Sequence, residues 1–229
     1  MATATTPFES FFHQWLDRQE TLLSQLLDAL SPEKPEYGDH HLAALIEQSL
    51  SHYRLYYREK SAAASRDGAC LFLSPPWLSS FERSLLWLGE FRPSTVFTLL
   101  RRVVPDLTPD QIRAVEVVRA ETRREERMLT EAMAAIQESI ASPAMLGLVR
   151  RTASQIDGER PQVDEAVDSL KSAMLSVMLS ADSLRGVTVA GMVEALSPVQ
   201  TAAFLVAAAE FQLSVRRWGR ERDDQRVGR

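Results

Sequence analysis

Apolar residues recur every three or four positions along most of this chain, the spacing that places them on one side of an α-helix. One such stripe runs from Phe8 to Leu30, and another runs from Phe204 to Trp218. No segment of adequate length alternates apolar and polar residues with β-branched enrichment, as a half-buried strand would. The pattern therefore predicts an all-α fold.

Helix boundaries can be placed from local signals. In three places a Ser or Thr is followed three residues later by Glu or Gln, the pattern of a capping box at a helix N-terminus. These pairs are Ser79 with Glu82, Thr108 with Gln111, and Ser197 with Gln200. With the Pro and Gly breaks, they predict helices at about 8–30, 42–60, 80–88, 94–100, 109–141, 163–178 and 198–218. We expect a bundle of about seven helices in a single domain at 8–222, with a flexible N-terminus (1–7) and a polar tail (223–229).

Composition limits the classes of function. The 229 residues include 45% apolar and 25% charged residues, enough for one substantial core, and the net charge of −5 argues against a generally basic nucleic-acid binder. Cys70 is the single cysteine and stands between Ala69 and Leu71, so a small buried side chain is expected. The first residues lack the layout of a secretory signal, and the uncharged stretch 195–209 is too short to span a bilayer. These features favour the nucleus or cytoplasm and no membrane span.

No catalytic or metal-binding motif is present. The sequence contains no phosphate-binding loop, dinucleotide fingerprint or zincin motif, and its four histidines and one cysteine cannot form a zinc cluster without carboxylate help. We therefore expect neither enzymatic activity nor a metal. The last predicted helix carries a group of arginines that either complement the helix dipole or contact an anion, calmodulin or another acidic partner. They are Arg216, Arg217, Arg220, Arg222 and Arg226.

The segment 77–94 is distinctive, and we call it the signature segment. Its marked residues are Trp77, Glu82, Arg83, Trp87, Gly89, Phe91 and Arg92. In order and spacing it resembles the domain shared by plant delay-of-germination proteins and the C-terminal halves of TGA-class leucine-zipper transcription factors. Further matches are Phe12 with Trp15, the step from Ala181 to Arg185, and Ser197, Pro198 and Gln200 followed by Trp218. These residues either define the fold or form a site.

The resemblance implies a non-enzymatic regulator of seed dormancy or maturation and abscisic-acid-linked signalling or transcription, acting through protein binding. In the family, an N-terminal aromatic segment is associated with binding clade A protein phosphatases, and the matching positions here are Phe12, Trp15, Leu16 and Gln19. The alternative is that these four residues are core. No basic helix or heptad run precedes Phe8, so zipper-type DNA binding is not expected.

The family's heme binding is linked to two histidines on the last helix. The matching positions are Gln212 and Arg216, neither of which is a normal iron ligand, so we expect no heme there.

Two other functions remain open. One is a helical module that senses a hydrophobic ligand, with a lining of Met174, Met178, Phe204 and Phe211, although such residues are more often plain core. The other is a transcriptional cofactor associated with TGA-class zipper factors. A homodimer is also compatible with the sequence.

Overall fold

The computed structural model describes residues 6–31, 39–143, 145–147 and 160–228. Within them the chain is all-α, as the periodicity predicts, and contains no strand beyond an isolated bridge between Trp87 and Glu90. The helices are α1 (Pro7–Leu30), α2 (Asp39–Asp67), α3 (Ala69–Leu73), α4 (Ser80–Ser84), α5 (Thr95–Val103), α6 (Pro109–Ile140), α8 (Arg160–Ala195) and α9 (Pro198–Val227).

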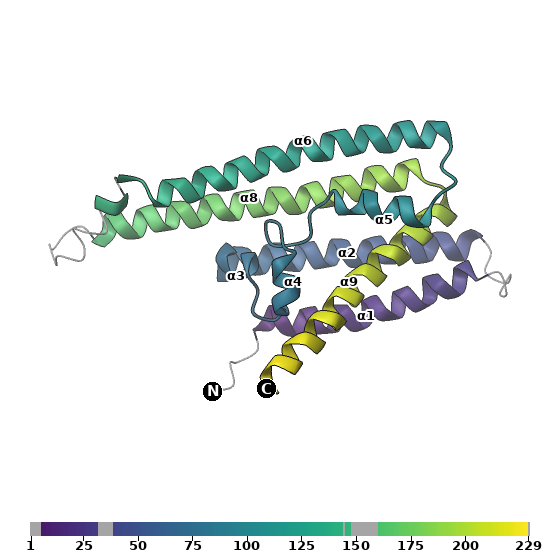
Figure 1. The fold of residues 1–229 in the computed structure, drawn as a ribbon, viewed down its shortest axis with the longest axis horizontal. Helices are drawn as coiled ribbons and strands as arrows, with labels where there is room; N and C mark the ends of the chain where they lie inside the picture. Colours follow the sequence, from purple (N-terminus) through teal and green to yellow (C-terminus); the bar gives the residue numbers. More distant parts are fainter. Residues whose placement is uncertain (1–5, 32–38, 144, 148–159, 229) are drawn as a thin grey trace.

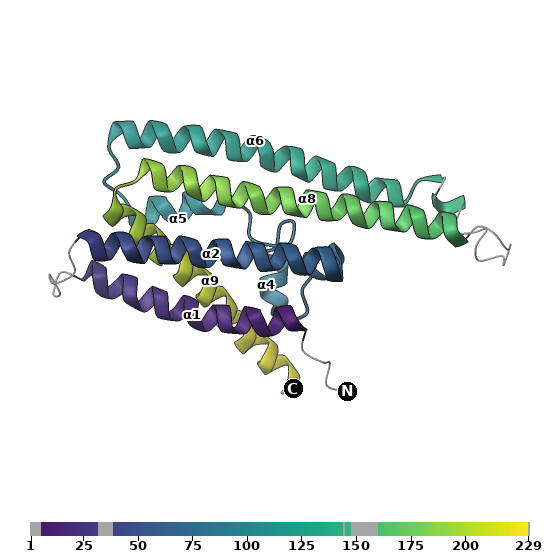
Figure 2. The same cartoon turned by 180° about the vertical axis from the view of Figure 1, so that it is seen from behind.

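The long helices form two layers (Figures 1 and 2). Helices α6 and α8 pack side by side as one antiparallel pair, which extends past the other helices at one end. Helices α1 and α2 form the second pair, and α9 crosses both of them diagonally. The short helix α5 lies between the layers and packs against α9.

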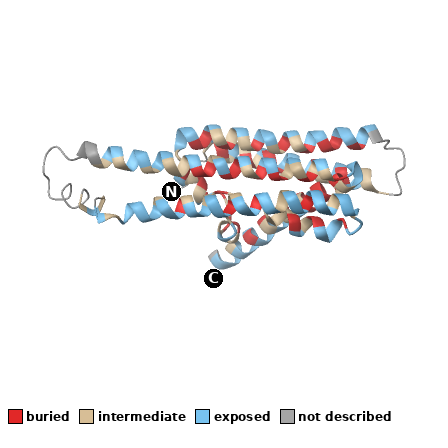
Figure 3. Cartoon of the chain, turned by 90° about the horizontal axis from the view of Figure 1, so that it is seen from above, coloured by how far each residue is buried: buried red, intermediate tan, exposed pale blue. Residues whose placement is uncertain are grey.

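Two clusters of buried side chains hold the layers together, and Figure 3 shows buried residues concentrated along the facing sides of the long helices. The first joins α2, α5, α8 and α9 through aliphatic residues and Phe97 and Phe204. The second is aromatic and lies around the first half of α1. It contains Phe8, Phe12, Trp15, Tyr56, Phe72 and Trp77.

All three predicted capping boxes are confirmed. The side chains of Ser79, Thr108 and Ser197 each accept a hydrogen bond from the backbone N–H three residues later. The Glu or Gln side chain at that later position accepts one from the backbone N–H of the Ser or Thr. The boxes of α6 and α9 also contact each other, because Gln111 Nε2 donates to Gln200 Oε1 at 2.7 Å. The capping residues therefore define where these helices begin, and they also hold the N-termini of α6 and α9 together.

The structure corrects four local expectations. Helix α4 ends at Ser84, so the predicted continuation to about residue 88 is wrong. The short helix α3 was not predicted, and Cys70 within it is exposed, where a buried side chain was expected. Helix α8 is longer than predicted at both ends. Most of the predicted C-terminal tail is helical, because α9 continues to Val227.

Helix α8 also bears on the expectation of no membrane span. Among the described residues, one segment, Val163–Ala195, is long and apolar enough to cross a membrane by length and composition alone. In this fold it packs along α6 and carries Asp182 and Arg185, a buried ion pair. Paired charges of this kind suit the interior of a bundle, and we interpret α8 as a bundle helix.

Candidate functional site

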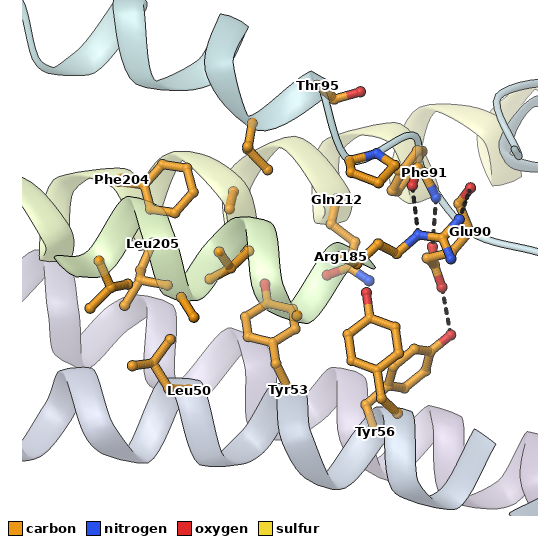
Figure 4. Close-up of a pocket in the computed structure, with 18 of the residues that line it drawn as sticks. Leu50, Tyr53, Tyr56, Glu90, Phe91, Thr95, Arg185, Phe204, Leu205 and Gln212 are labelled. Carbon is orange, nitrogen blue, oxygen red and sulfur yellow. Dashed lines mark hydrogen bonds between the residues drawn. The ribbon is translucent and has the colours of Figure 1, made fainter. Parts of the chain in front are cut away.

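A cavity of about 450 Å³ lies between α2, α8 and α9, and the chain from Glu90 to Thr95 closes one side of it (Figure 4). Leu50, Phe204 and Leu205 form part of an apolar wall, and Phe91 lies near the opposite end. Helix α8 adds a strip of small and aliphatic residues. These are Gly186, Val189, Ala190 and Val193. The wall is therefore mainly apolar, as is typical of ligand pockets in helical bundles.

Polar groups gather at one end of this cavity, around Arg185. Its Nε donates to the carbonyl oxygen of Phe91 at 2.8 Å, and its Nη2 donates to the carbonyl oxygen of Glu90 at 3.1 Å (Figure 4). Nη2 also donates to the carbonyl oxygen of Trp87. Its Nη1 donates to Asp182 Oδ1 at 2.6 Å. One guanidinium group thus donates hydrogen bonds to several backbone carbonyls within residues 87–91 and holds this turn against α8.

This turn explains why α4 stops early. Leu88 and Gly89 have positive φ angles of 50° and 85°, in the left-handed region. A Cβ on Gly89 would lie 3.0 Å from the carbonyl oxygen of Phe72, so a larger residue would be crowded as well as strained. Arg185 supplies hydrogen-bond donors to carbonyl oxygens of this turn.

Arg185 belongs to a buried cluster of charged side chains that also contains Asp182 and Lys60. Lys60 Nζ on α2 lies 2.9 Å from Asp182 Oδ1, with the two side chains 1% and 7% exposed. Asp182 therefore pairs with two cations, although its Oδ2 is buried without a hydrogen-bond partner. Glu90 accepts a hydrogen bond from the Tyr56 hydroxyl at 2.6 Å, which links α2 to the turn.

Three tyrosines of α2 line the same cavity: Tyr53, Tyr56 and Tyr57. Burial raises the pKa of each phenol well above its ordinary value, and the nearby charge of Glu90 raises it further. All three are therefore neutral hydroxyl groups at physiological pH. They offer hydrogen bonds to the polar end of a ligand and no charge.

Marked side chains of the signature segment make contacts within the fold. Trp77 is buried in the aromatic cluster, and Arg83 Nη1 donates to the carbonyl oxygen of Leu78 at 2.7 Å. Glu82 caps α4 and also lies 3.3 Å from Arg216 of α9. The Trp87 ring has guanidinium groups of Arg92 and Arg185 within 5.4 Å and 5.5 Å of its centroid.

Trp87 also ties the turn to α6, the neighbour of α8 in the same layer, because its Nε1 donates to Thr130 Oγ1 at 3.0 Å. Trp218 differs from the other marked aromatics because its side chain is 43% exposed.

The four N-terminal contact candidates are all buried. Phe12, Trp15, Leu16 and Gln19 are 3–7% exposed and face the bundle. Trp15 stacks on His52 with ring centroids 4.5 Å apart and donates to the His52 carbonyl oxygen at 3.1 Å. Gln19 donates to the Tyr53 hydroxyl. In this fold they form the α1–α2 interface, which is the core alternative, and a partner could reach them only if α1 left the bundle.

His52 is an unusual member of that interface. Its side chain is 7% exposed and its Nε2 is buried without a hydrogen-bond partner. Burial, with a smaller effect from the positive charge of Arg18, lowers its pKa from 6.5 to about 4. The ring is therefore neutral at neutral pH and acts as a flat partner for Trp15.

Two of the four residues expected to line a ligand pocket do line this cavity. Phe204 and Phe211 line the cavity, whereas Met178 is fully buried in the core and Met174 packs beside it. Sequence reasoning missed the tyrosines, Lys60 and Glu90. A cue existed for the tyrosines and Lys60, because Tyr53, Tyr56 or Tyr57, and Lys60 follow one another at helical spacing on α2.

The expectations about heme and metals concern residues near this site. Gln212 lines the cavity, and Arg216 is buried against Glu82. Within the described residues, no group of three or more His, Cys, Asp or Glu side chains is placed to hold a metal ion.

Comparison with known proteins identifies the family. The family model described as "DOG1: Seed dormancy control" matches residues 22–102. The chain is 40% identical to Protein ZW2 of Arabidopsis thaliana over 223 residues, which cover 96% of this chain and 99% of that protein. The chain belongs to the DOG1-like family. Protein DOG1-like 4 of the same plant is 31% identical over 94% of this chain and 93% of that protein. Protein RESPONSE TO ABA AND SALT 1, also of Arabidopsis thaliana, is 35% identical over 98% of both chains.

The same relationship extends to zipper factors. Transcription factor TGA1 of Arabidopsis thaliana is 31% identical over 204 residues, which are 89% of this DOG1-like chain but 53% of that factor. The chain therefore matches about half of TGA1, and the sequence resemblance on the signature segment is confirmed.

Proposed function

We propose that this DOG1-like protein is a non-enzymatic regulator of seed dormancy or maturation that acts in abscisic-acid-linked signalling by binding other proteins. The observation that carries the proposal is the end-to-end similarity to Protein RESPONSE TO ABA AND SALT 1. The buried polar groups of the site support it, because Lys60, Asp182 and Arg185 are satisfied mainly by one another and by backbone carbonyls. Groups held in this way stabilise a fold and are not free for proton transfer.

The test is genetic. Seeds that lack the protein are expected to germinate with an altered response to applied abscisic acid, and the full-length chain should restore the response. A full-length chain that carries Arg123→Ala is a suitable control and should restore the response equally, because Arg123 is exposed on α6 and lies outside the lining of the cavity. Unaltered dormancy and abscisic-acid response in the deficient seeds would contradict the proposal.

Clade A protein phosphatases are the partner class that the family resemblance suggests. Because Phe12, Trp15, Leu16 and Gln19 are buried, binding through them would require α1 to separate from α2. We propose instead that a phosphatase contacts exposed surface, with the bundle intact. Hydrogen exchange distinguishes the two: amides of α1 should keep their protection in the complex, and loss of that protection would favour detachment of α1.

A second candidate function rests on the cavity. Its volume of about 450 Å³ and its mainly apolar wall suit a hydrophobic molecule with one polar end placed near Arg185 and the tyrosines. Native mass spectrometry of the purified protein should then show a retained small molecule. Ala208 lies in the wall, so Ala208→Trp should fill the cavity and abolish retention, whereas Ala135→Trp on the exposed side of α6 should not. Retention unaffected by Ala208→Trp would refute this candidate.

Heme is not the ligand that we propose for this cavity. Gln212 is a poor iron ligand, and the Arg216 guanidinium is committed to Glu82. Titration with hemin is expected to give no saturable shift of the Soret band, and a sharp one-to-one shift would contradict this.

A further candidate is a role as a transcriptional cofactor, which the similarity to Transcription factor TGA1 supports. In that case the protein works in the nucleus and associates there with zipper factors. It does so either as a monomer or as a homodimer. Co-purification of TGA-class factors from nuclear extract supports this role, and a protein confined to the cytosol argues against it.

A further inference from the structure

Trp218 is a large aromatic residue of the last helix that remains accessible although its position is fixed. It is 43% exposed, yet its ring meets Phe81 edge to face with centroids 4.3 Å apart. The guanidinium of Arg222 lies 4.7 Å from the centre of the same ring. An exposed Trp held from two sides can bind a partner with little loss of side-chain entropy, and Trp and Arg are the residues most enriched at interface hot spots.

The backbone beneath Trp218 is fixed as well. A Cβ on Gly219 would lie 2.1 Å from Ser79 Oγ, so α9 approaches the start of α4 as closely as glycine allows. Asp223 accepts hydrogen bonds from the Ser80 hydroxyl and from the Ser80 N–H, the latter at 2.8 Å. The end of α9, which projects beyond α1 in Figure 1, is thereby locked to α4.

Apolar surface continues from Trp218 onto α4. Phe81 is partly exposed, and Leu85 follows it by four residues and is 38% exposed. Residues four apart lie on the same side of a helical turn, so Phe81 and Leu85 extend the surface in one direction. The result is an aromatic and aliphatic patch without a covering helix among the described residues.

The edge of this patch is positively charged. Arg222 and Arg226 are exposed and follow Trp218 by one and two helical turns. From residue 217 to residue 226, four arginines outnumber the three carboxylates of Glu221, Asp223 and Asp224. Asp223 is turned towards Ser80, from which it accepts hydrogen bonds. Because the whole chain carries a net charge of −5, this positive edge contrasts with the rest of the molecule and would attract an acidic partner.

We propose that the patch formed by Trp218, Phe81, Leu85, Arg222 and Arg226 binds an acidic amphipathic peptide segment of a partner protein. Apolar side chains of the segment pack on Trp218 and Phe81, and its carboxylates pair with Arg222 and Arg226. Arginine suits this pairing because its guanidinium offers two parallel hydrogen bonds to a carboxylate. This inference rests on the proposed function in protein binding and adds the surface and the chemistry of the partner.

The test uses the full-length protein and a fluorescein-labelled helical peptide in which Asp and Glu flank Leu and Phe at helical spacing. Fluorescence anisotropy should show saturable binding, weakened at least ~10-fold by Trp218→Ala and by the double change Arg222→Glu with Arg226→Glu. Arg123→Glu on the exposed side of α6 is the matched charge control and should leave binding unchanged. Thermal unfolding of each variant checks that the fold is intact, and Trp218→Phe should restore part of the affinity if Trp218→Ala unfolds the chain.

Several outcomes would overturn the inference. The first is that the double arginine variant binds the peptide as tightly as wild type. The second is that the protein binds phosphatidylserine vesicles and not the peptide. The third is that light scattering shows self-association that depends on Trp218. The proposed function is tested separately: if seed partners are retained by the Trp218→Ala protein, this surface is wrong while protein binding stands.

Discussion

Lys60 of α2 and Asp182 of α8 form an ion pair of 2.9 Å in the interior, with both side chains almost removed from solvent. This pair joins the two helical layers directly beneath the Arg185 network. Removing one partner of a buried pair leaves an uncompensated charge, which is far more costly than losing an exposed pair.

Lys60→Met is therefore expected to lower the free energy of unfolding by about 3 kcal/mol, since Asp182 keeps Arg185 but loses its second cation. Urea denaturation followed by circular dichroism measures the change. Arg54→Ala, which breaks an exposed pair with Glu47, is the control and should cost less than about 1 kcal/mol. Equal costs for the two variants would show that the interior pair is not the link between the layers.

His52 should make stability depend on pH. Its pKa is about 4 in the folded protein and 6.5 when unfolded, so between these values the unfolded chain binds the extra proton. The stability contributed by the neutral ring is complete above pH 6.5 and is lost as pH falls towards 4, by about 2–3 kcal/mol.

His52→Phe keeps a flat ring beside Trp15 and removes the titration. The difference in unfolding free energy between variant and wild type should grow in favour of the variant from pH 7 to pH 4.5. Because all other groups titrate alike in both proteins, a difference that stays constant with pH would contradict the assignment.

Two glycines should respond to alanine with opposite signs. Gly89 has φ of 85° and its added Cβ would crowd the Phe72 carbonyl, so Gly89→Ala should destabilise the fold by about 2 kcal/mol. Gly186 lies inside α8 with open space around it, so Gly186→Ala should stabilise by about 0.5–1 kcal/mol. Melting temperatures of the two variants check this, and a tolerated Gly89→Ala would mean that the turn is not held as described.

Trp15 should act as a core residue. Trp15→Ala removes a buried ring and its hydrogen bond to His52, at an expected cost of about 3–5 kcal/mol, whereas Gln14→Ala on the exposed side should cost less than about 0.5 kcal/mol. Chemical denaturation gives both values. A Trp15→Ala protein as stable as wild type that nevertheless loses its partners would favour a detachable α1.

The sequence was sufficient for the features that depend on local signals. Ser79, Thr108 and Ser197 mark helix starts through a cap formed within four residues, and all three helices begin there. The end of α4 depends instead on Arg185, about a hundred positions away, whose bonds to the 87–91 carbonyls cannot be seen in the local pattern. Likewise, α9 continues past residue 222, where Asp223 accepts a hydrogen bond from the distant Ser80.

The candidate site was only partly predictable for the same reason. Phe204 and Phe211 could be inferred from the apolar stripe of the last helix, and both reach the cavity. Whether an inward residue lines a cavity or fills the core depends on the helices opposite, and for Met178 the opposite residues close around it. The pairing of Lys60 with Asp182 joins two helices far apart in the chain, and helical spacing alone does not indicate it.

The most direct test of protein binding is affinity purification of the tagged full-length chain from maturing seeds that lack the native copy, followed by mass spectrometry. We predict specific recovery of signalling or transcription proteins, and depletion of at least one of them when Trp218→Ala is used in place of wild type. A folded, well-expressed chain that recovers no protein above the level of a tagged unrelated control would contradict the claim that it works by binding other proteins.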